Sequence, residues 1–300
     1  NILRTALYRP FCKQRVYFCR RLIDAICHIP KFFPTPEHKN LAICVPGVGG
    51  TKEFSCIIAD QIPDIQLNFN GQCFPLYWYE RAGDGGWIRR DGITDWALSE
   101  ARSRYGAGVQ KEDVFYYVYG CLHSPSWRER FSTDLKKSLP RIGWVGDADR
   151  FWAFSKAGRA LADLHVNYER VEAWEGVEVR GEEYGLYLVE KMVFAKKAVV
   201  TGNRRSDKDD RTTIVYNRYI TISNVPERAY EYVVNGKSAI EWVMEEYRFS
   251  THKESGLVND PNRWCDEVGD SRYILKLLLS VITVSLRTLD IVEGLPDWEN

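Results

Sequence analysis

The sequence predicts an α+β fold, in which a mixed or antiparallel β-sheet unit carries an inserted helical bundle. Two patterns lead to this prediction. Apolar residues alternate with polar ones along several short segments, as in half-buried strands, whereas residues 91–170 repeat them every three or four positions, as in amphipathic helices. The chain has 300 residues, 45% of them hydrophobic, which is enough for two packed units or one large one. We therefore expect residues 1–90 and 171–300 to complete one β-rich unit around a helical segment 91–170.

Residues 1–90 are expected to contain four short extended segments: Tyr8–Phe18, Leu41–Val45, Phe54–Ile58 and Pro75–Tyr79. The Gly-rich stretch 47–52 joins the second to the third. Its spacing does not match a nucleotide-binding loop, because Thr51 precedes Lys52, whereas such a loop places Lys before Ser or Thr. We expect Gly83–Arg90 to be irregular and to mark the boundary with the helical segment.

About four helices are predicted in residues 91–170 from apolar periodicity and capping residues. Thr94 is suited to cap a helix that ends at Tyr105, and Ser124 with Pro125 is suited to start another. The other helices are expected at Lys111–His123 and Arg150–Tyr168. We expect His123 and His165 to be hydrogen-bonded residues of the core or surface rather than metal ligands.

A β-hairpin opens the C-terminal part. Its strands are predicted at Val177–Val200 and Thr212–Ile222, and the charged segment Gly202–Arg211 is expected to be a long loop between them. Asn217 falls in the middle of the second strand, where β-propensity alone would not place it.

Three helices are predicted to follow the hairpin. The first begins after Pro226 and ends at Asn235–Gly236, because Gly adopts the left-handed conformation that terminates helices. The second runs from Ser238 to Tyr247, with Glu241 completing a capping box. The last, Ser271–Leu289, carries a wide apolar face.

Composition narrows the possible functions. Lys plus Arg equals Asp plus Glu, at 41 each, which argues against a protein that wraps DNA by bulk positive charge. None of the eight Cys forms a C-x-x-C pair, so we expect thiols in a reducing cytoplasm rather than a zinc site. The longest apolar run, 273–286, contains Lys276 and is too short to cross a membrane. The chain begins at Asn1 rather than at Met, and we therefore expect it to be a fragment of a longer polypeptide.

Several blocks of the sequence carry a resemblance to a known family. The clearest is Tyr230–Met244 (YEYVVNGKSAIEWVM), which is followed by Val258–Trp264. Four further blocks precede it in the same order: Tyr8–Phe18, Asn40–Tyr79, Asp113–Pro125 and Ala162–His165. Together they resemble the C-terminal specificity region of type ISP restriction–modification enzymes. This chain has Cys12 and Cys19 where the family pattern has Asp.

The resemblance implies a DNA target-recognition domain of a single polypeptide that also carries a nuclease, a helicase motor and an adenine methyltransferase. The expected partners are double-stranded DNA and the methyltransferase and helicase domains of the same polypeptide. S-adenosylmethionine and ATP with Mg²⁺ are expected in the missing domains. No cofactor is expected in this chain. The Asn-Pro-Pro-Tyr type motif of adenine methyltransferases does not occur here, so we expect no catalytic centre in this chain.

Base reading needs Arg or Lys for guanine and Asn or Gln for adenine, and phosphate contacts use the same cations. The candidate DNA-binding residues are Thr51, Lys52, Arg81, Asn217, Arg218, Asn259, Asn262 and Arg263. Each has a structural alternative, such as satisfying a neighbouring strand or capping a turn. A second hypothesis is a structural coupler between motor and methyltransferase that does not bind DNA. An apolar patch near Tyr8–Phe18 would favour the coupler, and a basic stripe would favour DNA binding.

Overall fold

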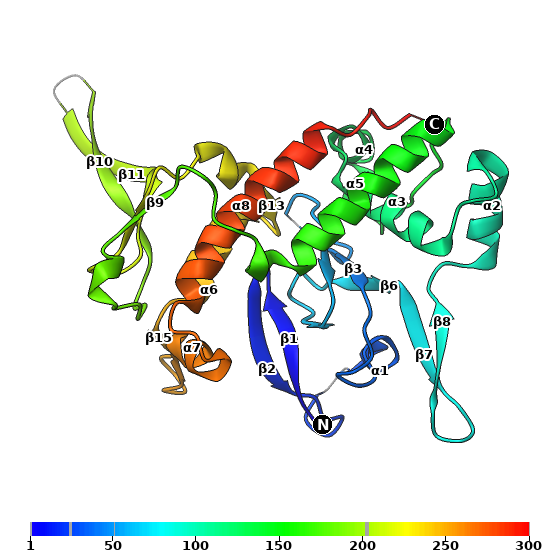
Figure 1. The fold of residues 1–300 in the computed structure, drawn as a ribbon, viewed down its shortest axis with the longest axis horizontal. Helices are drawn as coiled ribbons and strands as arrows, with labels where there is room; N and C mark the ends of the chain where they lie inside the picture. Colours follow the sequence, from blue (N-terminus) through cyan, green and yellow to red (C-terminus); the bar gives the residue numbers. More distant parts are fainter. Residues whose placement is uncertain (1, 24–25, 51, 202–203, 300) are drawn as a thin grey trace. The chain divides into compact units, whose positions relative to one another are not determined.

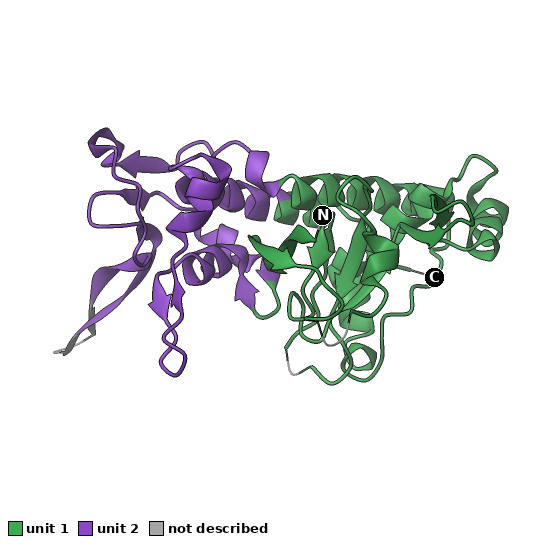
Figure 2. Ribbon diagram, turned by 90° about the horizontal axis from the view of Figure 1, so that it is seen from below, with its two compact units in different colours: residues 1–167, 234–236, 288–300 green, residues 168–233, 237–287 purple. Residues whose placement is uncertain are grey.

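The computed structural model describes residues 2–23, 26–50, 52–201 and 204–299. It confirms the predicted α+β class, with several small, mostly antiparallel sheets and helices α1 to α8 in the described part of the chain (Figure 1). The chain divides into two compact units. Unit 1 comprises residues 1–167, 234–236 and 288–300, and unit 2 comprises residues 168–233 and 237–287 (Figure 2). None of the described helices is long and apolar enough to cross a membrane.

Unit 1 contains three small sheets. Their order is β2-β1-β5, β4-β3-β6 and β7-β8. The strands are β1 (Leu3–Arg9), β2 (Cys12–Tyr17), β3 (Ala42–Val45), β4 (Ile57–Ala59), β5 (Ile62–Pro63), β6 (Gln72–Pro75), β7 (Tyr77–Arg81) and β8 (Trp87–Asp91). The first predicted segment is therefore a hairpin that turns at Phe11, which is fully buried with φ 61°.

The irregular boundary predicted at Gly83–Arg90 is wrong. Trp87–Asp91 is strand β8, paired with β7 in the register Arg81↔Trp87 to Tyr77↔Asp91. The glycines before Trp87 form only the turn of this hairpin, with Gly85 at φ 85°. The glycine content led to the wrong prediction of irregular structure, because a Gly-rich stretch is as typical of a tight turn as of a long loop.

The helices of unit 1 follow the predicted caps closely. They are α1 (Ile29–Phe32), α2 (Asp95–Tyr105), α3 (Lys111–His123), α4 (Pro125–Arg130) and α5 (Ala148–Val166). Thr94 Oγ1 accepts from the Ala97 amide at 3.2 Å, and Ser124 Oγ accepts from Trp127 at 3.3 Å, so both predicted caps are confirmed. Each cap satisfies one backbone amide that the first helical turn leaves unpaired.

At the crossing of α3 and α5, two glycines let the helix backbones approach each other closely. A Cβ built on Gly158 would lie 1.9 Å from the Tyr116 carbonyl oxygen, and one on Gly120 would lie 2.2 Å from that of Phe154. Around this crossing Phe151 stacks between Tyr105 and Tyr117, with ring centroids 4.4 and 5.0 Å away. The same core includes residues of β3 and β4, so the helices cover that sheet.

A buried polar network lies inside this otherwise apolar core. His165 is within hydrogen-bond distance of Tyr119 Oη (2.7 Å) on one side and Thr288 Oγ1 (2.9 Å) on the other. His123 Nδ1 donates to the Tyr119 carbonyl oxygen at 3.0 Å, and the Cys56 thiol lies 3.4 Å from the same nitrogen. Both histidines are core residues, as predicted.

Unit 2 is built around the four-stranded antiparallel sheet β10-β11-β12-β9. Its strands are β9 (Glu178–Arg180), β10 (Val193–Thr201), β11 (Arg204–Val215), β12 (Thr221–Ser223), β15 (Ser250–Thr251) and β16 (Val258–Asn259). Its helices are α6 (Ala239–Glu246), α7 (Asn262–Val268) and most of α8 (Tyr273–Glu293). β13 (Val233–Val234) and β14 (Lys237–Ser238) flank the segment 234–236.

Two strand predictions in this unit are wrong. The strand predicted at Thr212–Ile222 is broken, because β11 ends at Val215, the chain turns, and Ile222 returns opposite Ile214 in β12. The strand predicted at Val177–Val200 is also broken, into β9 and β10. The first break escapes an alternation argument, since apolar residues continue to alternate across a tight turn, and the second contains residues 181–192, which belong to no strand.

The predicted charged loop and the predicted end of a helix are also wrong. Residues 204–211 belong to β11, where Asp209 lies opposite Lys196 and pairs with it at 2.5 Å. Asn235 (φ 49°) and Gly236 (φ 80°) turn the chain between β13 and β14 instead of ending a helix. The next prediction is confirmed, since Ser238 and Glu241 form the capping box of α6.

We predict that Gly158→Ala destabilises the protein by about 1–3 kcal/mol, because the added methyl group forces α3 and α5 apart. Gly108→Ala is the matched control, since a Cβ there meets nothing within 4 Å. Urea denaturation measures both variants. Equal stabilities for the two would contradict the close crossing.

The buried histidines predict a loss of stability in acid. Burial lowers the pKa of His165 to about 3 and holds the pKa of His123 well below its ordinary value. The unfolded chain binds these protons near pH 6.5, so the unfolding free energy falls below that pH by about 1.4 kcal/mol per pH unit for each histidine. His165→Gln should reduce this slope between pH 6.5 and 4, whereas His28→Gln, at an exposed site, should not. Identical slopes would refute the assignment.

Candidate nucleic-acid interface

The predicted DNA-binding residues are distributed over both units. Lys52 and Arg81 belong to unit 1, and Asn217, Arg218, Asn259, Asn262 and Arg263 belong to unit 2. Thr51 lies outside the described residues.

In unit 2, two predicted asparagines hold the same irregular segment, residues 186–189. Asn217 Nδ2 donates to the carbonyl oxygens of Leu186 (2.9 Å) and Leu188 (3.1 Å). Asn262 brackets Val189, accepting from its amide and donating to its carbonyl oxygen, both at 2.9 Å. The side-chain amides of Asn217 and Asn262 therefore satisfy backbone hydrogen-bonding groups of this segment, as a neighbouring strand would.

Asn217 also shapes the turn that separates β11 from β12. Its Oδ1 accepts from the amides of Tyr219 (2.9 Å) and Ile220 (2.8 Å). With both amide hydrogens donated to the segment 186–189, the side chain has its bonding capacity filled. This explains why an Asn stands where the sequence otherwise alternates like a strand.

Each of these asparagines is followed by an exposed arginine. Arg218 follows Asn217 in the turn, with its guanidinium carbon 5.3 Å from the centre of the Tyr219 ring. Arg263 follows Asn262 in the first turn of α7 and is also exposed. Because both asparagines hold one short segment, the two arginines start from neighbouring parts of the backbone. Among the described residues neither guanidinium has an acidic ion-pair partner.

Asn259 is at the end of the short hairpin β15-β16 and is exposed. Its Nδ2 reaches the Arg248 carbonyl oxygen only at 3.4 Å, which is near the limit of a hydrogen bond. Most of the hydrogen-bonding capacity of this side chain is therefore available to another molecule.

In unit 1, Lys52 lines a pocket of about 360 Å³ beside the Gly-rich loop. Its stem passes close to Gly236, where a Cβ would lie 2.7 Å from Lys52 Cδ; the left-handed φ of 80° at this position also favours glycine. Two further cations, Arg128 and Lys136, line the same pocket together with Glu53 and Glu129. Arg128 and Lys136 are not predicted from the sequence, since they come from a helical segment with no basic run.

Arg81 lies at the end of β7 and faces Trp87 across the hairpin. Its guanidinium carbon is 4.0 Å from the centre of the Trp87 ring, and its Nη1 donates to the Gly85 carbonyl oxygen at 2.8 Å. The arginine is therefore exposed but held in a defined orientation. Arg89 and Arg90 of the opposite strand are not among the predicted residues, because their segment was expected to be irregular.

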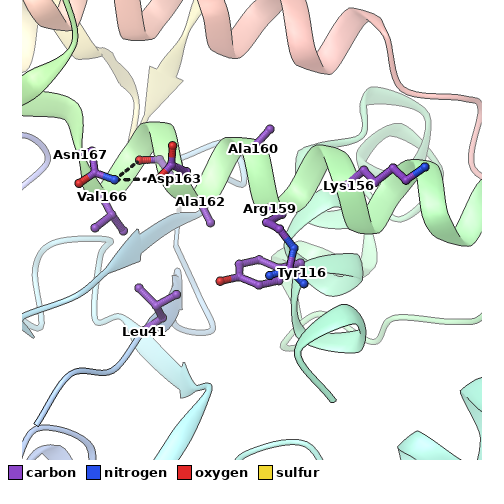
Figure 3. Close-up of a pocket in the computed structure, with 9 residues that line it drawn as sticks. All are labelled: Leu41, Tyr116, Lys156, Arg159, Ala160, Ala162, Asp163, Val166 and Asn167. Carbon is purple, nitrogen blue, oxygen red and sulfur yellow. Dashed lines mark hydrogen bonds between the residues drawn. The ribbon is translucent and has the colours of Figure 1, made fainter. Parts of the chain in front are cut away.

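A pocket of about 580 Å³ in unit 1 follows one face of α5 (Figure 3). Arg159 stacks over Tyr116 at 4.2 Å and pairs with Asp113 at 3.0 Å, and Asn167 bonds back to Asp163 at 2.8 Å. Burial raises the pKa of Tyr116, so its hydroxyl stays protonated. These bonds leave a mostly apolar groove with Lys156 at its rim, which is an arrangement for contact rather than for acid–base chemistry.

The two roles in unit 2 predict different effects on stability. Asn217→Ala should lower the unfolding free energy by about 1–3 kcal/mol, because it removes the four hydrogen bonds with which this side chain holds the turn and the segment 186–189. Arg218→Ala, at the next position, should change it by less than about 0.5 kcal/mol. Thermal or urea denaturation distinguishes them, and a large loss for Arg218→Ala would show that this arginine is structural.

Comparison with known proteins assigns the fold to a family. The family model described as the type ISP C-terminal specificity domain matches residues 1–277. The ATP-dependent type ISP restriction–modification enzyme LlaBIII, solved bound to DNA, has 39% sequence identity and a TM-score of 0.88 over 99% of this chain and 19% of its own. No curated protein sequence matches the chain.

Two further solved structures have the same fold. A nuclease-deletion mutant of the type ISP enzyme LlaGI, in complex with a DNA substrate mimic, is 40% identical with a TM-score of 0.81, over 99% of this chain and 25% of its own. The DrdV–DNA complex is 27% identical with a TM-score of 0.83, over 100% and 29%. This chain thus spans less than a third of each solved chain. By the extent of the family match, the chain belongs to the type ISP C-terminal specificity domains.

Proposed function

We propose that this specificity domain binds double-stranded DNA and recognises the target sequence of a restriction–modification enzyme. It would position the DNA for adenine methylation and ATP-dependent cleavage by other domains of the same polypeptide. The observation that carries the proposal is the match over 99% of the chain to two type ISP enzymes solved with DNA or a DNA mimic. The exposed cations around residues 186–189 and the Gly-rich loop supply the chemistry that phosphate and base contacts need.

One observation favours an additional protein-binding role. Leu3 and Tyr17 face each other across β1 and β2, and each side chain is 52% exposed. Ile2, whose carbonyl oxygen accepts from the Phe18 amide, is 46% exposed beside them. This apolar cluster near the start of the chain is suited to contact another domain of the polypeptide, as the coupler hypothesis requires. It is compatible with DNA recognition elsewhere on the domain.

The salt dependence of DNA binding tests the proposal. The logarithm of the association constant for random duplex DNA should fall linearly with the logarithm of salt concentration, by about 0.9 for each phosphate neutralised. Arg218→Ala combined with Arg263→Ala should make the slope shallower by up to about 2. Arg180→Ala is the control, because Arg180 pairs with Glu178 at 3.1 Å and its charge is compensated. Absence of binding by the wild-type chain would leave the coupler as the better hypothesis.

A further inference from the structure

The hairpin of β7 and β8 is a separate two-stranded sheet in unit 1, hydrogen-bonded to no other described strand (Figure 1, cyan). Two strands alone are marginally stable, so this ribbon depends on its side chains and its base for support. At the base, Tyr77 Oη donates to Glu112 Oε1 at 2.8 Å, and Asp91 pairs with Lys111 at 2.9 Å. Both bonds attach the ribbon to the first turn of α3.

Two arginines share one face of this ribbon. The register places Arg81 opposite Trp87 and Tyr79 opposite Arg89, so Arg81 and Arg89 lie diagonally on the same face. Arg89 stacks on Tyr77, with its guanidinium carbon 4.2 Å from the ring centre, just as Arg81 stacks on Trp87. Both arginines are exposed. Stacking holds the guanidinium planes, so less conformational freedom is lost when they bind a ligand.

The acidic residues of the ribbon do not compensate these two cations. Asp84 accepts from the Gly86 amide at 2.9 Å, and Asp91 pairs with Lys111. Glu80 pairs at 3.1 Å with Arg90, which lies on the opposite face. Within the described part of the chain, Arg81 and Arg89 have no carboxylate partner. The ribbon therefore has net zero charge but presents positive charge on one face.

We infer that this ribbon enters the major groove of the target DNA and that Arg81 and Arg89 read guanine bases there. This inference rests on the proposed DNA-binding function. The major groove is about 12 Å wide and admits a two-stranded ribbon, and a guanidinium can bond the O6 and N7 atoms of guanine together. Arg89 is thereby a specificity-determining residue, and its neighbour Arg90 provides a matched control on the other face.

Selection of bound duplexes from a random DNA library by the full 300-residue chain tests the inference. The wild-type chain should enrich a motif that includes G·C pairs. Arg89→Ala should lose the preference for guanine at one position, by about 5- to 150-fold in relative affinity. Arg90→Ala, which removes the same charge from the same strand, should enrich the wild-type motif.

A second variant separates base reading from charge and from folding. Arg89→Lys keeps the positive charge and a stem over Tyr77 but lacks the planar fork, so it should keep the salt dependence and weaken the guanine preference. An unchanged motif in both Arg89 variants would overturn the inference and leave the proposed function intact. A uniform loss of affinity with the motif unchanged would do the same. If the wild-type chain binds DNA but enriches no motif, or does not bind, the proposed function fails and the inference with it.

Discussion

The direct contact between the backbones of α3 and α5 is the constraint on which unit 1 depends. At most helix crossings side chains keep the axes 8–10 Å apart, whereas here Gly120 and Gly158 leave no room for even a methyl group. This proximity lets Phe151, Tyr105 and Tyr117 stack in one layer and lets Ser155 Oγ donate to the Asp113 carbonyl oxygen at 2.9 Å. The helical layer that results covers β3 and β4, and the Gly-rich loop with Lys52 is part of the connection between those strands.

In unit 2 the corresponding constraint is polar. Residues 186–189 belong to no described strand, and their hydrogen-bond partners come from side chains rather than from a sheet ladder. Asn217 and Asn262 supply them, and the Tyr216 hydroxyl adds a bond to the Tyr187 carbonyl oxygen at 3.0 Å. The asparagine side chains thus form their hydrogen bonds within the protein, while the arginines that follow them remain exposed. This division of work places the positively charged groups on a rigid support, which a recognition surface requires.

The same principle applies to the β7–β8 ribbon, where aromatic rings rather than asparagines hold the arginines. Trp87 and Tyr77 each support a guanidinium, and the His38 ring packs edge-on against Tyr79 at 4.8 Å on that face. A neutral total charge is therefore no obstacle to the proposed DNA recognition. In the ribbon, Glu80 pairs with Arg90 and Asp91 with Lys111, while Arg81 and Arg89 are oriented by aromatic rings.

The sequence by itself determined the α+β class, the helix caps at Thr94, Ser124 and Ser238, and the family. These features depend on local spacing, which survives in the linear order of residues. Tertiary structure alone decided that Asn217 turns the chain, that residues 204–211 form a strand, and that Trp87–Asp91 pairs with β7. Each of these outcomes depends on a hydrogen-bond partner tens of residues away or across a turn, and local pattern carries no information about such a partner. The role of Gly158 could not be predicted from the sequence for the same reason. Only the close approach of the neighbouring helix requires a residue without a side chain at this position.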